Sequence, residues 1–229
     1  MPASILYVRP MPPETATQRR SRARRIARRL AAAYPGAGCA LHFRTPFQLL
    51  VATVLSAQCT DKKVNEVTRE LFRDYGTAAK LAAASSAEVE RIVRPTGFYR
   101  QKTKSILGLA NDLVNRFGGR VPRTLDELVT LRGVARKTAN VVLGNAFGVP
   151  GLAVDTHMKR VNGRLGLTFH DDPDKIERDL MELIPETAWT EYTHRVIHHG
   201  RVCCDARRPR CGSCPLAGDC PWPARGART

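Results

Sequence analysis

Apolar residues recur in this chain three and four positions apart, which is the spacing of one face of an α-helix. The clearest stripes are Val64, Val67 and Leu71; Ile106, Leu109, Leu113 and Val114; and Ile176, Leu180 and Leu183. The alternation of apolar and polar residues that marks strands does not recur. The pattern therefore predicts an all-α fold.

Local signals mark where helices begin. Ser85–Glu88 and Thr124–Glu127 have the spacing of a capping box, in which a hydroxyl and a carboxylate satisfy free amides of the first turn. Asp171 or Asp172 before Pro173 predicts another start. Short loops are expected between these helices.

The N-terminal part combines a tail with a basic helix. Thr17–Ala33 carries seven arginines, with Ile26 and Leu30 at helical spacing, and predicts a basic amphipathic helix. Residues 1–17 contain four prolines, which argue against a signal-peptide core and an amphipathic transit helix. We expect a disordered tail there, with Met11 as an alternative start.

The net charge of the chain indicates which kinds of partner it binds. Lys and Arg number 37 against 21 Asp and Glu, a formal charge of +16. A protein this basic commonly binds a polyanion, first of all nucleic acid, although a solvated arginine-rich surface is the alternative. The apolar stretch Phe47–Ala57 is too short to cross a bilayer, so it predicts a buried helix and no membrane is expected as a partner.

Seven cysteines are present, and four lie near the C-terminal end with the spacing C-x6-C-x2-C-x5-C. These four are Cys204, Cys211, Cys214 and Cys220. Their clustering argues against a disulfide framework and for a ligand set in a reducing compartment. Four thiolates suit zinc or an iron–sulfur cluster, and their chemistry leaves both open. We interpret Cys39, Cys59 and Cys203 as packing residues.

The segment Leu131–Ala139 joins two helices through a tight turn. The turn exposes backbone amides at the start of the second helix, where the helix dipole also suits a phosphate. The residues that carry these amides are Gly133, Val134, Ala135 and Arg136. Such contacts position a nucleic-acid backbone without reading its sequence. A plain corner between helices is the alternative.

Lys137 falls in the first turn of that second helix. The positive end of the helix dipole and partial burial both favour the neutral amine that a nucleophilic lysine needs. The alternative is a point charge on a phosphate, and the residues alone favour that alternative.

Several separated motifs stand in order along the chain. The hairpin is followed by Lys137–Leu143 and by Ala153–His157, which contains Asp155; Leu55–Gln58 and Gly97–Tyr99 precede it. With these motifs and the terminal cysteines, the chain resembles the endonuclease III family of helix–hairpin–helix DNA glycosylases from about residue 24 to its end.

The resemblance implies two domains. A six-helix domain with the hairpin would occupy residues 39–149, and an iron–sulfur domain would be built from both chain ends, residues 18–38 and 150–229. The four spaced cysteines would hold a [4Fe-4S] cluster, and the loop between the first two would present Arg207, Arg208 and Arg210 to phosphates. The protein would be a monomer in the bacterial cytoplasm, associated with the nucleoid.

The resemblance also implies a reaction. The protein would be a bifunctional DNA glycosylase and AP lyase of base excision repair that removes oxidised pyrimidines from double-stranded DNA and acts on abasic sites. Lys137 would attack C1′ of an extruded nucleotide with assistance from Asp155, and β-elimination from the Schiff base would nick the strand on the 3′ side. Monofunctional relatives lack this lysine. An N-cap is the alternative for Asp155, and both roles can hold together.

An extruded nucleotide leaves a gap in the duplex that the protein fills. Gln58 matches the family's polar wedge, whose amide can hydrogen-bond the orphaned base. Phe98 stands where the family carries an apolar wedge that stacks between bases. The alternatives are a surface residue at a helix end for Gln58 and core packing for Phe98.

Three positions depart from the family. The family usually has proline and a second glycine in the hairpin, where this chain has Arg132 and Ala135. The methyl group of Ala135 puts the hairpin geometry in question, whereas Arg132 adds a cation. Cys59 stands where the family often has a small residue. The competing hypotheses are a catalytically weak or specialised paralogue that mainly binds damaged or abasic DNA, and a redox protein whose cluster is the active centre.

Overall fold

The computed structural model describes residues 14–222, and every regular element within that range is helical, which confirms the all-α prediction. The predictions about the prolines and Met11 fall before residue 14 and lie outside the described residues. Within the described residues the chain divides into two compact units, residues 39–151 and residues 14–38 together with 152–222. No helix in residues 14–222 has the length and apolar content to span a membrane.

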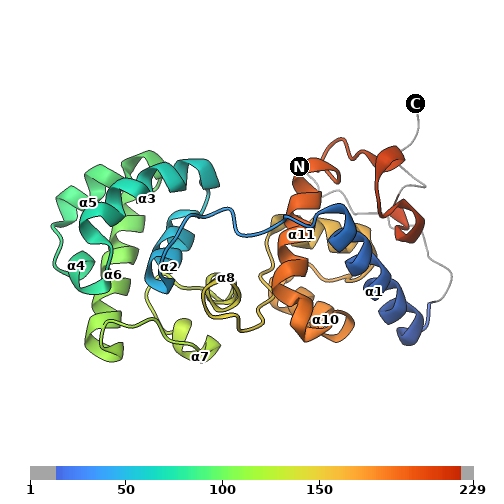
Figure 1. Ribbon diagram of the computed structural model, residues 1–229, viewed down its shortest axis with the longest axis horizontal. Coiled ribbons are helices and arrows are strands. Elements are labelled where there is room, and N and C mark those ends of the chain that lie inside the picture. The colour runs from blue at the N-terminus through green and yellow to red at the C-terminus, as the bar shows by residue number, and fades with distance from the viewer. Residues whose placement is uncertain (1–13, 223–229) are drawn as a thin grey trace. The chain divides into compact units, whose positions relative to one another are not determined.

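The unit Cys39–Gly151 contains seven α-helices and one short 3-10 helix. They are α2 (Pro46–Leu55), α3 (Asp61–Tyr75), α4 (Ala78–Ala82), α5 (Ser86–Val93), η1 (Arg94–Thr96), α6 (Tyr99–Phe117), α7 (Leu125–Leu128) and α8 (Arg136–Phe147). Figure 1 shows α4 and α5 beside α6, and α2 packs on α8. The single turn of α7 brings the count to seven where six were expected.

The core of this unit is formed by the predicted stripes. Val64 and Leu71 of α3 and Ile106 and Leu109 of α6 are fully buried, and burial of each such side chain stabilises the fold by about 1.5–3 kcal/mol. Val114 is exposed, although it was assigned to the same stripe. The buried face of α6 holds this helix in place, and with it the loop that precedes it.

The other unit is built from both ends of the described chain. Its elements are α1 (Ala16–Ala33), α9 (Thr156–Arg164), α10 (Pro173–Leu183), η2 (Glu186–Ala188), α11 (Trp189–Val202), η3 (Cys211–Ser213) and η4 (Ala217–Asp219). Ile26 and Leu30 of α1 share one core with Tyr192 and Val196 of α11. The α1 helix is therefore an integral part of the unit that contains the terminal cysteines.

The helix α1 begins earlier than the sequence predicted. Thr15 and Gln18 form a complete capping box, so Ala16 and Thr17 are helical. The prediction of a disordered tail is therefore wrong for residues 14–17, which the structure describes. Glu14 also forms an ion pair with Arg22 at 2.8 Å, and this pair ties the start of the described chain to the helix.

Part of the charge on α1 is structural. Arg22 is buried, and its guanidinium donates to the carbonyl oxygens of Leu165 and Asp219. Arg25 and Arg29 both pair with the carboxylate of Asp219. Three of the seven arginines of α1 thus hold the unit together.

The capping predictions have different outcomes. Thr124 caps α7, since its hydroxyl oxygen accepts a hydrogen bond from the amide of Glu127. Asp172 caps α10, since its carboxylate accepts a hydrogen bond from the amide of Lys175. Ser85 stands at the N-cap of α5 but makes no side-chain cap hydrogen bond, so the capping box predicted there is wrong. Glu88 instead interacts with Tyr75, and this interaction raises the pKa of the Tyr75 hydroxyl.

Candidate nucleic-acid interface and cysteine cluster

The hairpin turn is built around Gly133. Its φ of 77° lies in the left-handed region, and the amide of Val134 donates to the carbonyl of Leu131 across the turn at 3.1 Å. Leu131 and Val134 are buried and anchor the turn in the core. A Cβ on Gly133 would lie 2.9 Å from Cβ of Ser105 on α6, so both conformation and space require glycine here.

The second helix of the hairpin, α8, starts without a side-chain cap. Ala135 is its N-cap residue, with extended backbone at φ −88° and ψ 165°, and its methyl group cannot accept the first-turn amides. An extended φ and ψ suit any residue, so alanine causes no backbone strain here. Ala135 thus leaves the first-turn amides of α8 without a side-chain cap. Its methyl group does not disturb the backbone of the hairpin, which the sequence had put in question.

Single substitutions at Gly133 and Ala135 test this description of the hairpin backbone. Gly133→Ala should lower the free energy of unfolding by about 1–3 kcal/mol, because a non-glycine residue would take a left-handed conformation against Ser105. Ala135→Gly is the matched variant and should stay within about 1 kcal/mol of the parent. Urea unfolding curves measure both, and equal losses for the two variants would contradict the geometry.

The cation of Arg132 is paired with an acidic residue. Its guanidinium pairs with the carboxylate of Asp112 on α6 at 3.1 Å, and its backbone amide donates to the same carboxylate. Burial acts to raise the pKa of Asp112, but the hydrogen bonds and charge of Arg132 outweigh it and lower that pKa. Arg132 thus adds a cation to the hairpin, as expected, and its ion pair with Asp112 also fastens the turn to α6.

Lys137 is the second residue of α8, in its first turn. Its side chain is exposed, so the partial burial predicted from the sequence is wrong. Within residues 14–222 it makes no hydrogen bond or ion pair. The amine is therefore accessible from solvent beside an uncapped helix start.

Gln58 and Phe98 share an unusual backbone conformation. Their φ values are 51° and 48°, and within residues 14–222 they are the only residues other than glycine with positive φ. Gln58 is exposed just after α2, and Phe98 is 67% exposed just before α6, which rules out core packing for Phe98. Strain of this kind gathers at functional sites, because only a specific environment maintains it.

Asp155 is the N-cap of α9. Its Oδ1 accepts the amide of Met158 at 2.8 Å, so the capping interpretation is confirmed. Burial lowers the pKa of neighbouring His157, while the charge of Asp155 opposes that shift. Only one carboxylate oxygen is engaged in the cap, so capping does not exclude a second role.

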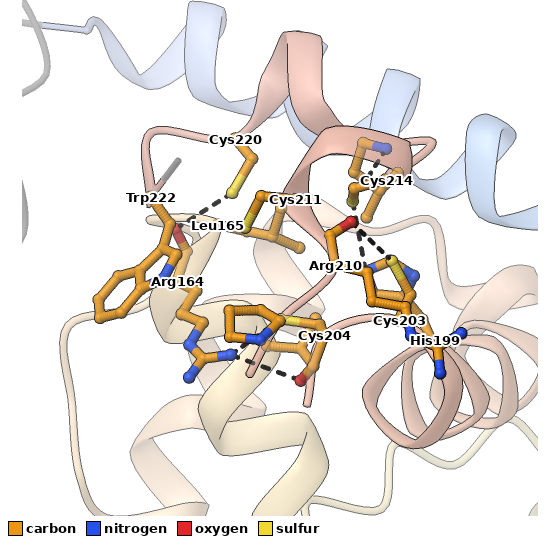
Figure 2. Close-up of a pocket in the computed structure, with 13 residues that line it drawn as sticks. Arg164, Leu165, His199, Cys203, Cys204, Arg210, Cys211, Cys214, Cys220 and Trp222 are labelled. Carbon is orange, nitrogen blue, oxygen red and sulfur yellow. Dashed lines mark hydrogen bonds between the residues drawn. The ribbon is translucent and has the colours of Figure 1, made fainter. Parts of the chain in front are cut away.

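The terminal cysteines surround one pocket, which Figure 2 shows. Cys204, Cys211, Cys214 and Cys220 line it, and so does Cys203. Two N–H donors point at the sulfurs of these cysteines, the Arg164 guanidinium at Cys204 and the Leu216 amide at Cys214. These donors suit thiolates.

The pKa values of the thiols show what the pocket requires. Burial raises the pKa of Cys220 to about 11 and that of Cys203 to about 12, and it also raises that of Cys211. Without a bound cation these thiols are protonated at neutral pH. A metal centre would reverse this, because its positive charge ionises the thiols it coordinates. The residues present therefore fit a bound iron–sulfur cluster.

Sequence reasoning missed the inner wall of the pocket. His199 Nε2, Cys203 Sγ and Cys214 Sγ all lie within 4.8 Å of one another, and Cys203 is buried, as a packing residue would be. The Tyr34 hydroxyl lies 2.8 Å from Nδ1 of His199, which is buried. The only sequence signal that could have placed His199 in the pocket wall is its position a few residues before the first of the cysteines.

The loop between the first two ligands is fixed from both sides. Oδ1 of Asp205 accepts the backbone amides of Arg207 and Arg208, and Arg164 donates to the carbonyls of Asp205 and Ala206. The side chains of Arg207, Arg208 and Arg210 are exposed. The loop is thus a rigid support for exposed positive charge.

Comparisons with known proteins define the class. The HhH-GPD superfamily of base excision DNA repair proteins matches residues 51–186, and the iron–sulfur binding domain of endonuclease III matches residues 204–220. The first match spans more than half of the chain, so the chain is a base excision DNA repair protein of this superfamily. The second match starts at Cys204 and ends at Cys220, which leaves Cys203 outside it.

The relatives specify the family. Endonuclease III of Synechocystis sp. is 52% identical over 204 residues, covering 89% of this chain and 93% of the relative, and endonuclease III of Bacillus subtilis is 46% identical over 188 residues, covering 82% and 86%. A solved non-covalent endonuclease III–DNA complex matches with a TM-score of 0.84 at 46% identity, over 89% of this chain and 95% of that one. The chain belongs to the endonuclease III family.

Membership settles the kind of activity and the cofactor. The protein is a bifunctional DNA glycosylase and AP lyase of base excision repair, and it carries a [4Fe-4S] cluster. When bound, the cluster supplies positive charge that keeps four thiols ionised and holds their loop together. The hypothesis of a protein whose chemistry is redox alone is thereby set aside.

Proposed function

We propose that the amine of Lys137 is the nucleophile of the glycosylase and lyase reactions. The observation that carries this proposal is its position: an exposed amine in the first turn of α8, directly after the hairpin. Lysine suits the task because its amine can lose a proton and attack, whereas an arginine guanidinium stays protonated.

The reaction proceeds in three steps. The neutral Nζ of Lys137 bonds to C1′ of the deoxyribose while the bond from C1′ to the base breaks, and the base leaves with that electron pair and takes one proton that the amine gives up. The bond from C1′ to the ring oxygen then breaks, the ring oxygen takes up a proton from water, and a protonated Schiff base forms between C1′ and Nζ. Removal of a proton from C2′ breaks the bond from C3′ to the phosphate oxygen, and the 3′ phosphate leaves with that electron pair, which nicks the strand.

We assign Asp155 a second role beside its cap. With Oδ1 engaged by Met158, the other carboxylate oxygen takes the proton from the attacking amine or stabilises cationic character on the sugar. Cap and catalysis are compatible because they use different oxygens of one carboxylate, which the cap holds in a fixed orientation.

We propose double-stranded DNA with an oxidised pyrimidine or an abasic site as the substrate. Phosphates of the DNA are contacted by the first-turn amides of α8 and by the exposed Arg207, Arg208 and Arg210. The net charge of +16 supports such contacts, because positive side chains neutralise phosphates. Gln58 and Phe98 fill the space left by the extruded nucleotide. The enzyme acts as a monomer at the nucleoid in the bacterial cytoplasm.

Borohydride trapping tests this function, because borohydride reduces the Schiff base to a stable adduct. The protein should form an adduct with duplexes containing an oxidised thymine or an abasic site, and none with undamaged DNA. Binding of the abasic duplex without an adduct would contradict the lysine mechanism. An adduct with an oxidised purine as abundant as that with an oxidised thymine would contradict the lesion class.

A further inference from the structure

A buried lysine lies beneath the loop that carries Phe98. Lys102 belongs to the first turn of α6 and is only 5% exposed, and within residues 14–222 no carboxylate pairs with it. Its Nζ donates to the carbonyl oxygen of Thr96 at 2.8 Å. A buried charge without a counter-ion is costly, so its retention indicates a purpose other than stability.

Lys102 holds the loop at two points. Its backbone amide donates to the carbonyl of Phe98 at 3.0 Å, and its ammonium reaches Thr96 two residues earlier. Thr96 is itself buried, and its hydroxyl donates to the carbonyl of Val93. Hydrogen bonds from an ionised donor are about twice as strong as neutral ones, which suits a lysine to this position.

The segment held in this way is strained. Gly97 and Phe98 take left-handed φ values of 70° and 48° in succession. A phenylalanine stays in this region only where its surroundings impose it. Relaxation would turn the exposed ring of Phe98 into another direction, and the contacts of Lys102 oppose this.

Burial also lowers the pKa of Lys102, because the ammonium is held away from solvent. The hydrogen bond from its Nζ to the carbonyl oxygen of Thr96 offsets part of that cost.

We propose that Lys102 is a positioning residue for base extrusion: it holds the Arg94–Phe98 loop so that the ring of Phe98 enters the duplex. The inference rests on the proposed wedge role of Phe98. Lys102 contacts neither the sugar nor the base, so it acts on extrusion of a base and leaves the later elimination step unaffected.

A double-mutant cycle on the cluster-containing enzyme tests this inference. Lys102→Met and Phe98→Ala should each slow single-turnover excision of an oxidised thymine about tenfold, and the double variant should be no slower than either. Fluorescence of 2-aminopurine beside the lesion should show the same loss of extrusion. Cleavage of a preformed abasic site should change by less than about threefold. Lys104→Met, exposed on the same helix, is the control.

The outcomes separate the two ideas. Normal excision by Phe98→Ala would remove the wedge role itself. Slow excision by Phe98→Ala with normal excision by Lys102→Met, or additive losses in the double variant, would overturn the role of Lys102. If Lys102→Met does not fold, Lys102→Gln replaces it in the double-mutant cycle, because glutamine keeps an N–H donor without the charge. The same outcomes then support or overturn the role of Lys102.

Discussion

Lys137→Ala abolishes borohydride trapping and strand cleavage and leaves folding intact. The side chain is exposed and makes no contact within residues 14–222, so its removal creates no cavity, and alanine is favourable in a helix. Loss of the nucleophile should lower the excision rate by about three orders of magnitude or more. Single-turnover excision and trapping on an abasic duplex measure the effect.

The matched control is Lys137→Arg. It keeps a cation in the first turn of α8, but its guanidinium cannot form a Schiff base. If Lys137 acts as a nucleophile, both variants are inactive and the arginine variant binds abasic DNA like the parent. Retention of strand cleavage by Lys137→Arg would show that the residue serves only as a charge on phosphate.

Cys204→Ser removes the iron–sulfur cluster and destabilises the unit that contains it. Among the described residues after α11, 203–222, Leu216 is the one apolar side chain with no exposed surface, so we expect the cluster to hold this segment together. Loss of a structural metal centre removes several kcal/mol, and the midpoint of thermal unfolding should fall by about 10 °C or more. Iron and sulfide content and visible absorption report the cluster directly.

The neighbouring thiol provides the control. Cys203 also lines the pocket and lies with His199 and Cys214, but it falls outside the family match that starts at Cys204. Cys203→Ser should therefore keep its iron, its absorption and its unfolding midpoint. Loss of iron from this variant, with retention by Cys204→Ser, would reverse the assignment of the first ligand.

The fold was largely predictable because its signals are local. Helical stripes such as Ile106 and Leu109, and caps such as Thr124 and Asp172, depend on residues within a few positions of each other. The capping box predicted at Ser85 was wrong, because Ser85 stands at the N-cap of α5 but its side chain makes no cap hydrogen bond.

The features of the site that the sequence did not predict depend on distant partners. Arg132 was expected to add a cation, but its ion pair with Asp112, 20 residues earlier, could not be predicted from the sequence. The exposure of Lys137 depends on how α8 packs, which its own sequence does not specify. The chemistry of the site was predictable where the residue type alone decides it, as for the amine of a lysine or for four cysteine thiols in a fixed spacing.

The pairing of Arg25 and Arg29 with Asp219 has a consequence for the order of synthesis. A ribosome delivers α1 first, yet its core partners follow residue 152, and Asp219 comes later still. Residues 39–151 form a continuous unit that can fold while the chain is still growing. The arginine-rich helix therefore lacks its core partners and the Asp219 carboxylate until the chain has been made as far as residue 219.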